Sequence, residues 1–139
     1  MAENDNEKAG ELDELRYMQQ VYQNQYTALS NAMNMHVQDL QMLSAVQRTL
    51  ENNGMLKGKE TLMHVGASVY MKAEVKDYGH AVVSVGGGYL VEKSVDEAKG
   101  FVSTMLAKKT EVVNGMSRSR KELQAALIEM SYKLDSAGR

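Results

Sequence analysis

Apolar side chains recur at alternating steps of three and four residues along residues 12–50, the spacing typical of a coiled-coil helix. This stepping gives twelve positions, of which nine are apolar or tyrosine, so the apolar stripe is nearly continuous. Asn52-Asn53-Gly54 follows, and asparagine and glycine tolerate the left-handed backbone that ends many helices. The pattern predicts a helix over 12–53, with a first seam that comprises Leu12, Leu15, Gln19, Tyr22, Tyr26, Leu29, Met33, His36, Leu40, Leu43, Gln47 and Leu50.

The same spacing returns near the end of the chain. Ser94-Val95-Asp96-Glu97 fits a helix-capping box, and two acidic residues fall in the first turn, where the helix dipole favours them. The spacing predicts a helix over 94–134, with a second seam that comprises Val95, Lys99, Val102, Leu106, Lys109, Val113, Met116, Arg120, Leu123, Leu127, Met130 and Leu134.

Two seams in one chain favour a long antiparallel coiled-coil hairpin, because each helix can bury its stripe against the other. In the alternative arrangement, each helix would need a separate partner chain. The polar seam positions are expected to set the pairing register or to extend toward solvent rather than to react, and they are Gln19, His36, Gln47, Lys109 and Arg120.

Between the helices the apolar spacing changes to two, which is typical of strands. Residues 63–65 lead into a turn at 66–68, after which residues 69–76 alternate. Residues 81–85 and 89–92 are short apolar runs separated by Gly86-Gly87-Gly88. The pattern predicts two β-hairpins in series. Isolated hairpins are marginal in water and their edges pair readily, so the segment predicts oligomerisation through a shared sheet or barrel. The expected subunit-interface residues are Val69, Met71, Val75, Val82, Val83, Val85, Tyr89, Leu90 and Val91.

The resulting fold class is mainly α with a small amount of β. The two long helices are joined by two β-hairpins that would assemble into an intersubunit β-barrel. The expected divisions are a polar disordered tail (1–11), the N-terminal helix (12–53), the double β-hairpin oligomerisation region (54–93), the C-terminal helix (94–134) and a short tail (135–139).

The composition excludes several classes of chemistry and of binding partner. The absence of cysteine excludes disulfides and thiolate chemistry, and the absence of proline suits long uninterrupted helices. A net charge of −2 with interspersed signs gives no basic surface for nucleic acid or for an anionic membrane. No signal-peptide or membrane-spanning pattern is evident, which predicts a cytoplasmic protein.

The sequence also predicts a protein that is not an enzyme, with no catalytic residue, no metal and no cofactor. The glycines at 86–88 precede a strand rather than a helix, so a tight turn explains them better than a phosphate-binding loop. His36, His64 and His80 fall on a helix, a strand and a loop. None forms an i, i+4 pair or joins a carboxylate cluster at the spacing of metal ligands.

The order helix, hairpin, hairpin, helix resembles the α-class subunits of the prefoldin family. The residues that carry the resemblance are Leu56-Lys57-Gly58, the segment from Met63 to Tyr70 and the segment from Val83 to Ser94. The chain departs from the family pattern at His64, where a proline is usual, and in its eleven methionines.

The resemblance implies a hexamer of two such subunits with four prefoldin beta subunits. It also implies ATP-independent capture of unfolded client proteins at the coiled-coil tips, followed by delivery to a group II chaperonin. The alternative is a structural coiled-coil oligomerisation module without client binding. The expected client-binding residues lie near the free ends of the two helices and are Leu12, Leu15, Tyr17, Met18, Tyr22, Leu127, Ile128, Met130, Tyr132 and Leu134.

Overall fold

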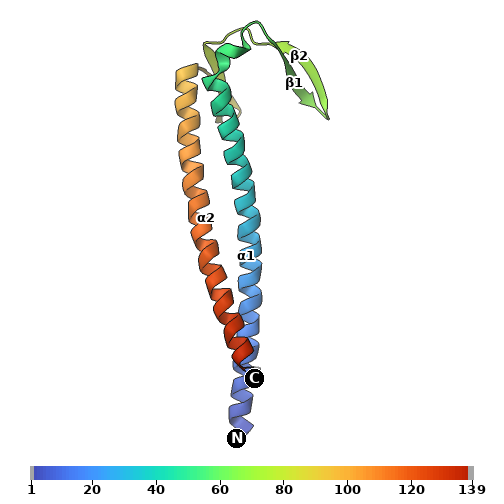
Figure 1. Cartoon of the computed structure of the whole chain (residues 1–139), viewed down its shortest axis with the longest axis vertical. Coiled ribbons are helices and arrows are strands. Elements are labelled where there is room, and N and C mark those ends of the chain that lie inside the picture. The colour runs from blue at the N-terminus through green and yellow to red at the C-terminus, as the bar shows by residue number, and fades with distance from the viewer. Residues whose placement is uncertain (1, 138–139) are drawn as a thin grey trace. The chain divides into compact units, whose positions relative to one another are not determined.

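The computed structural model describes residues 2–137, which form two helices and two antiparallel β-hairpins (Figure 1). The elements in chain order are α1 (Ala2–Glu51), the 3-10 turn η1 (Asn53–Leu56), β1 (Glu60–Gly66), β2 (Val69–Glu74), β3 (His80–Gly86), β4 (Tyr89–Ser94) and α2 (Val95–Ala137). Over the part of the chain described, neither helix contains a stretch long and apolar enough to cross a membrane.

The chain divides into two compact units. The first combines Met1–Gln38 with Thr110–Arg139, and the second is the continuous segment Asp39–Lys109. In the first unit α1 and α2 lie side by side and run antiparallel (Figure 1). The Gln19 side-chain amide donates a hydrogen bond of 3.1 Å to the Ser131 hydroxyl, so a polar seam position fixes the pairing of the helices there.

The second unit contains the other ends of both helices together with the hairpins. The Gln47 amide donates a hydrogen bond of 3.2 Å to the Ser103 hydroxyl, and Lys109 Nζ lies 3.0 Å from Asp39 Oδ2. In both contacts a residue of α1 meets a residue of α2. The later residue of α1 contacts the earlier residue of α2, as expected for antiparallel helices. These contacts confirm that Gln47 and Lys109 pair across the seam.

Burial along the helices follows the predicted seams. All twelve positions of the first seam and all twelve of the second are half-buried or buried. Val102 and Met130 are among the most buried side chains, and Ala98 is more buried than the neighbouring seam residue Lys99. The Lys99 side chain is partly exposed, and its Nζ lies 3.8 Å from the Asp96 carboxylate one turn earlier on the same helix.

Helix α1 begins earlier than the sequence predicts. Residues 2–11 are helical and their described side chains are exposed, so the expectation of a disordered tail is wrong there. Glu3 and Asp5 in the first turn complement the helix dipole, and the segment lacks proline. Residues 135–137 likewise continue α2, while positions 1, 138 and 139 of the expected tails lie outside the described residues.

The other helix ends agree with the sequence. Helix α1 ends at Glu51, directly before Asn52, and α2 begins at Val95 after the predicted cap. The Ser94 hydroxyl accepts a hydrogen bond of 3.2 Å from the Glu97 backbone N–H, which is the first contact of a capping box.

The two hairpins share one register, displaced by twenty residues. Glu60 pairs with Glu74 and His64 with Tyr70, while His80 pairs with Ser94 and Ser84 with Leu90. Each first strand carries a β-bulge one residue before its turn, at Val65 and at Val85. Strand β1 begins at Glu60, earlier than the sequence indicates. Strand β2 ends at Glu74 rather than at residue 76, so Val75 lies outside it.

Both turns use two residues with positive φ, the geometry that matches the twist of a two-residue hairpin. Gly87 and Gly88 have φ of 62° and 79°, which confirms the tight turn predicted at the glycine triplet. The first hairpin places Ala67 and Ser68 in the same conformation, with φ of 44° and 63°. A side chain with a Cβ is disfavoured there, so the first turn is the more strained of the two.

We therefore expect the double substitution Ala67→Asn, Ser68→Gly to stabilise the first hairpin by about 1 kcal/mol, because Asn-Gly favours this turn. Amide hydrogen exchange in β1 and β2 should slow by roughly fivefold. The matched variant Gly88→Ala, where open space surrounds the new Cβ, should speed exchange in β3 and β4 through backbone strain alone. Unchanged exchange in the first hairpin would contradict the assignment of strain to this turn.

Candidate functional site

The free ends of the two helices lie in the first unit and separate the ten expected client-binding residues into two groups. Tyr17, Ile128 and Tyr132 are 70%, 62% and 75% exposed, and Met18 is also on the exposed side. The remaining six are half-buried or buried in the seam, namely Leu12, Leu15, Tyr22, Leu127, Met130 and Leu134. The exposed group is available to a partner without any opening of the helix pair.

An open groove of about 510 Å³ lies beside the last turn of α2. Leu12 and Leu15 contribute its apolar side chains, and Lys8 and Lys133 contribute its cationic ones. Lys133 Nζ also lies 3.4 Å from the Glu129 carboxylate on the same helix. Two seam leucines therefore line an accessible groove at this end of the helix pair.

The apolar residues of the hairpins are the second candidate surface. Of the nine expected interface residues, all except Val83 are exposed in the single chain. Val82 and Leu90 lie on the same face of the second hairpin, because Val82 pairs with Glu92 and Ser84 with Leu90. They are 64% and 70% exposed.

Val83 and Val85 do not form a regular pair on the opposite face. Val83 pairs with Val91 and is half-buried, while Val85 occupies the bulge, which interrupts the alternation of side chains. The expected interface set also omits four exposed apolar residues of the first hairpin, three in β1 and one in β2. Those residues are Leu62, Met63, Val65 and Tyr70.

Tyr78 links the connection between the hairpins to the segment that follows the first helix, a role that was not predicted from the sequence. Its hydroxyl accepts a hydrogen bond from the Gly58 N–H at 3.0 Å and donates one to the Leu56 carbonyl at 3.3 Å. Its own carbonyl accepts a hydrogen bond from the Asn53 side chain. Nearby, the Val95 N–H at the start of α2 donates to the Gly79 carbonyl at 3.0 Å. The root of both hairpins is thus held by specific hydrogen bonds.

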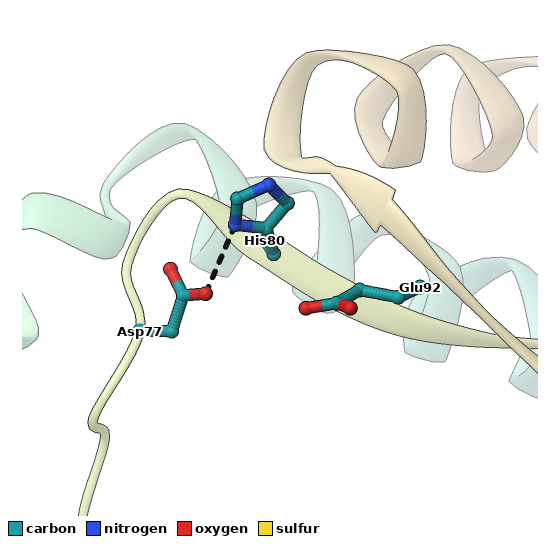
Figure 2. Close-up of side chains that lie close together, drawn as sticks. All are labelled: Asp77, His80 and Glu92. Atoms are coloured by element: carbon teal, nitrogen blue, oxygen red, sulfur yellow. Dashed lines mark hydrogen bonds and ion pairs between the residues drawn. The ribbon is translucent and has the colours of Figure 1, made fainter.

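The same connection gathers Asp77, His80 and Glu92, whose potential ligand atoms all lie within 4.8 Å of one another (Figure 2). The expectation that His80 stands apart from carboxylates, drawn from its spacing in the sequence, is wrong. Asp77 Oδ2 lies 2.9 Å from His80 Nδ1, and Asp77 Oδ1 accepts a hydrogen bond from the Gly79 N–H at 2.8 Å. The Gly79 hydrogen bond, followed by the one with His80, lowers the pKa of the Asp77 carboxyl, which is therefore ionised at neutral pH.

Comparison with known proteins places this arrangement in a family. The family model described as "Prefoldin subunit" matches residues 15–139. Prefoldin subunit alpha of Pyrococcus horikoshii is 34% identical over 133 residues, covering 93% of this chain and 84% of the relative. Human prefoldin subunit 5 is 31% identical over 77 residues, covering 53% of this chain and 50% of the relative.

A solved structure has the same fold. A chain of filamentous PFD from Methanocaldococcus jannaschii, studied by cryo-EM, superposes with a TM-score of 0.66. The match is 21% identical in sequence and covers 81% of this chain and 94% of the other. Together, the family match, the alpha-subunit relatives and the two helices joined by two hairpins establish that this chain belongs to the prefoldin family, as a subunit of its alpha class.

Proposed function

We propose that this chain is a subunit of an ATP-independent chaperone that captures unfolded polypeptides at the free ends of its helix pair. Family membership makes it a chaperone-type subunit. The observation that carries the finer proposal is the exposure of Tyr17, Ile128 and Tyr132 beside a seam that is already buried. These side chains do not contribute to the helix pairing, so they are free to be covered by a client.

The energetics suit weak and unselective capture. Covering exposed apolar area gains about 25 cal/mol per Å², so each large side chain supplies only one or two kcal/mol when it is partly covered. Affinity then comes from several arms that bind the same client, through their effective concentration. Release follows by mass action and needs no hydrolysis.

The assembly that we propose combines two copies of this chain with four prefoldin beta subunits in the cytoplasm, and hands its client to a group II chaperonin. The exposed apolar face of the hairpins supports assembly, because a monomeric protein rarely leaves such a face in water. The interspersed charges argue for protein clients rather than nucleic acid, and the proposed mechanism has no enzymatic step.

A second candidate is a structural coiled-coil module that oligomerises without binding clients. The fold match to a chain of filamentous PFD favours it, because a filament is an oligomer built by repeated subunit contacts. A closed hexamer has a fixed mass, whereas the mass of an open filament grows with concentration. Analytical ultracentrifugation of the chain with its beta partner separates them.

The test of the chaperone proposal is light scattering. A chemically denatured, aggregation-prone protein is diluted into buffer with an equimolar amount of the assembled complex and without ATP. Scattering should be largely suppressed. Full scattering in the presence of an intact complex would favour the structural module, and albumin at the same mass concentration controls for crowding.

A further inference from the structure

We propose that Asp77, His80 and Glu92 form a binding site for a divalent transition-metal ion such as Zn²⁺ at the root of the second hairpin. The three groups supply one imidazole nitrogen and two carboxylates, with their ligand atoms within 4.8 Å of one another. Figure 2 shows the Glu92 carboxylate directed toward the other two side chains. The site lies in the second unit and is independent of client capture at the helix ends.

The backbone brings these residues together. His80 pairs with Ser94 and Val82 with Glu92, so His80 and Glu92 lie on one face of the hairpin as diagonal neighbours. Diagonal side chains on adjacent strands are within reach of each other when they are long. Asp77 is brought to the same place by the tight connection that leads into β3, where the Gly79 carbonyl accepts a hydrogen bond from the first residue of α2.

The first hairpin provides an internal test of this geometry. Its equivalent diagonal pair, twenty residues earlier, is Glu60 and Lys72. Their charged groups lie 3.5 Å apart, so side chains at these two positions do meet. In the second hairpin His80 occupies the position of Glu60, and Glu92 occupies the position of Lys72. Two potential metal ligands therefore stand where the first hairpin has an ion pair.

The Asp77 carboxylate is already oriented. One of its oxygens is held by the Gly79 N–H, while the other faces His80 Nδ1 at 2.9 Å. An outer hydrogen bond that fixes a ligating carboxylate is a regular feature of metal sites. An ion placed between Asp77 Oδ2 and His80 Nδ1 would replace the proton that they share, and the Gly79 contact would be kept.

The donor set favours Zn²⁺ over Mg²⁺ or Ca²⁺, since the latter two prefer oxygen ligands alone. Ligand atoms around tetrahedral Zn²⁺ are roughly 3.3 Å apart, because each lies about 2 Å from the metal. The ligand atoms here lie within 4.8 Å of one another, and Glu92, which is exposed in the single chain, can rotate to close the difference. Water would complete the coordination, so the expected affinity is micromolar.

The experiment is isothermal titration of Zn²⁺ into the full chain purified with its assembly partners. One site of micromolar affinity per chain is expected, and both His80→Ala and Glu92→Gln should weaken it by about tenfold or more. The matched control is His64→Ala, which removes an exposed strand histidine whose cross-strand partner is Tyr70 rather than a carboxylate. This variant should bind as the wild type does, and millimolar Mg²⁺ should not compete.

Two results would overturn the proposal: absence of saturable Zn²⁺ binding, or equal affinity in the wild type and in His80→Ala. If His80→Ala impairs assembly, Glu92→Gln provides the same test, because the amide keeps the shape of the side chain. Visible absorption of the Co²⁺-substituted protein adds a direct readout, since the wild type should show a ligand-field band that both variants lose.

Discussion

Placing aspartate at both Val82 and Leu90 should prevent assembly of this chain with its partners. The two side chains share one face of the second hairpin and are largely exposed in the single chain. If that face is the subunit contact, each aspartate must be buried without a partner, which costs several kcal/mol per charge. Sedimentation should show free chains or small, irregular species instead of one defined complex.

Helix content should be retained in this variant, because the seams are untouched. The matched control is Val112→Asp, which puts the same charge on an exposed valine of α2. It should assemble normally. A complex of unchanged mass from the Val82→Asp, Leu90→Asp chain would show that this face does not contribute to the contact.

Replacing Tyr17, Ile128 and Tyr132 together by serine should abolish client capture while the complex stays intact. Each side chain is mostly exposed, so its removal leaves little void in the helix pair. If each contributes about 1.5 kcal/mol when a client covers it, the triple variant loses roughly a thousandfold in affinity per arm. The protection seen by light scattering should fall to that of the albumin control.

A suitable control exchanges exposed apolar residues elsewhere on the same helices. Met35→Ser with Val112→Ser removes side chains that are 68% and 44% exposed. Protection should be unaffected in this variant. If the control and the triple variant lose activity equally, capture depends on general surface hydrophobicity and the helix ends have no special role.

The helices could be predicted from the sequence because their information is local and repeated. A three–four spacing over twelve positions determines which side is buried, and every seam position is indeed at least half-buried. The turn at Gly87 and the cap at Ser94 were equally predictable, since each depends on the chemistry of a few adjacent residues.

The features that the sequence did not reveal depend on register. Whether His80 meets Glu92 depends on which residues pair across β3 and β4, and a shift of one residue would send the side chains to opposite faces. The β-bulge at Val85 also depends on register, since it is defined by which residues of β3 and β4 pair. Tyr78 acts through backbone groups twenty or more residues away.

The ten residues before Leu12 were misjudged for another reason. They lack an apolar stripe, and a helix without one has little tertiary support. They nevertheless continue α1, because a formed helix extends more easily than a new one nucleates, and six of these ten residues are Ala, Glu or Lys, which favour helix. The absence of a stripe predicted exposure correctly, and it did not predict disorder.

Each hairpin, as described in this chain, is a ribbon of two strands, so each strand has one side whose backbone amides and carbonyls lack a strand neighbour. A newly made copy therefore carries four open strand edges. Any extended polypeptide, including another copy of this chain, could form backbone hydrogen bonds with them. Production of this subunit in step with its assembly partners would keep those edges occupied, and a surplus of it alone should be the first species to precipitate.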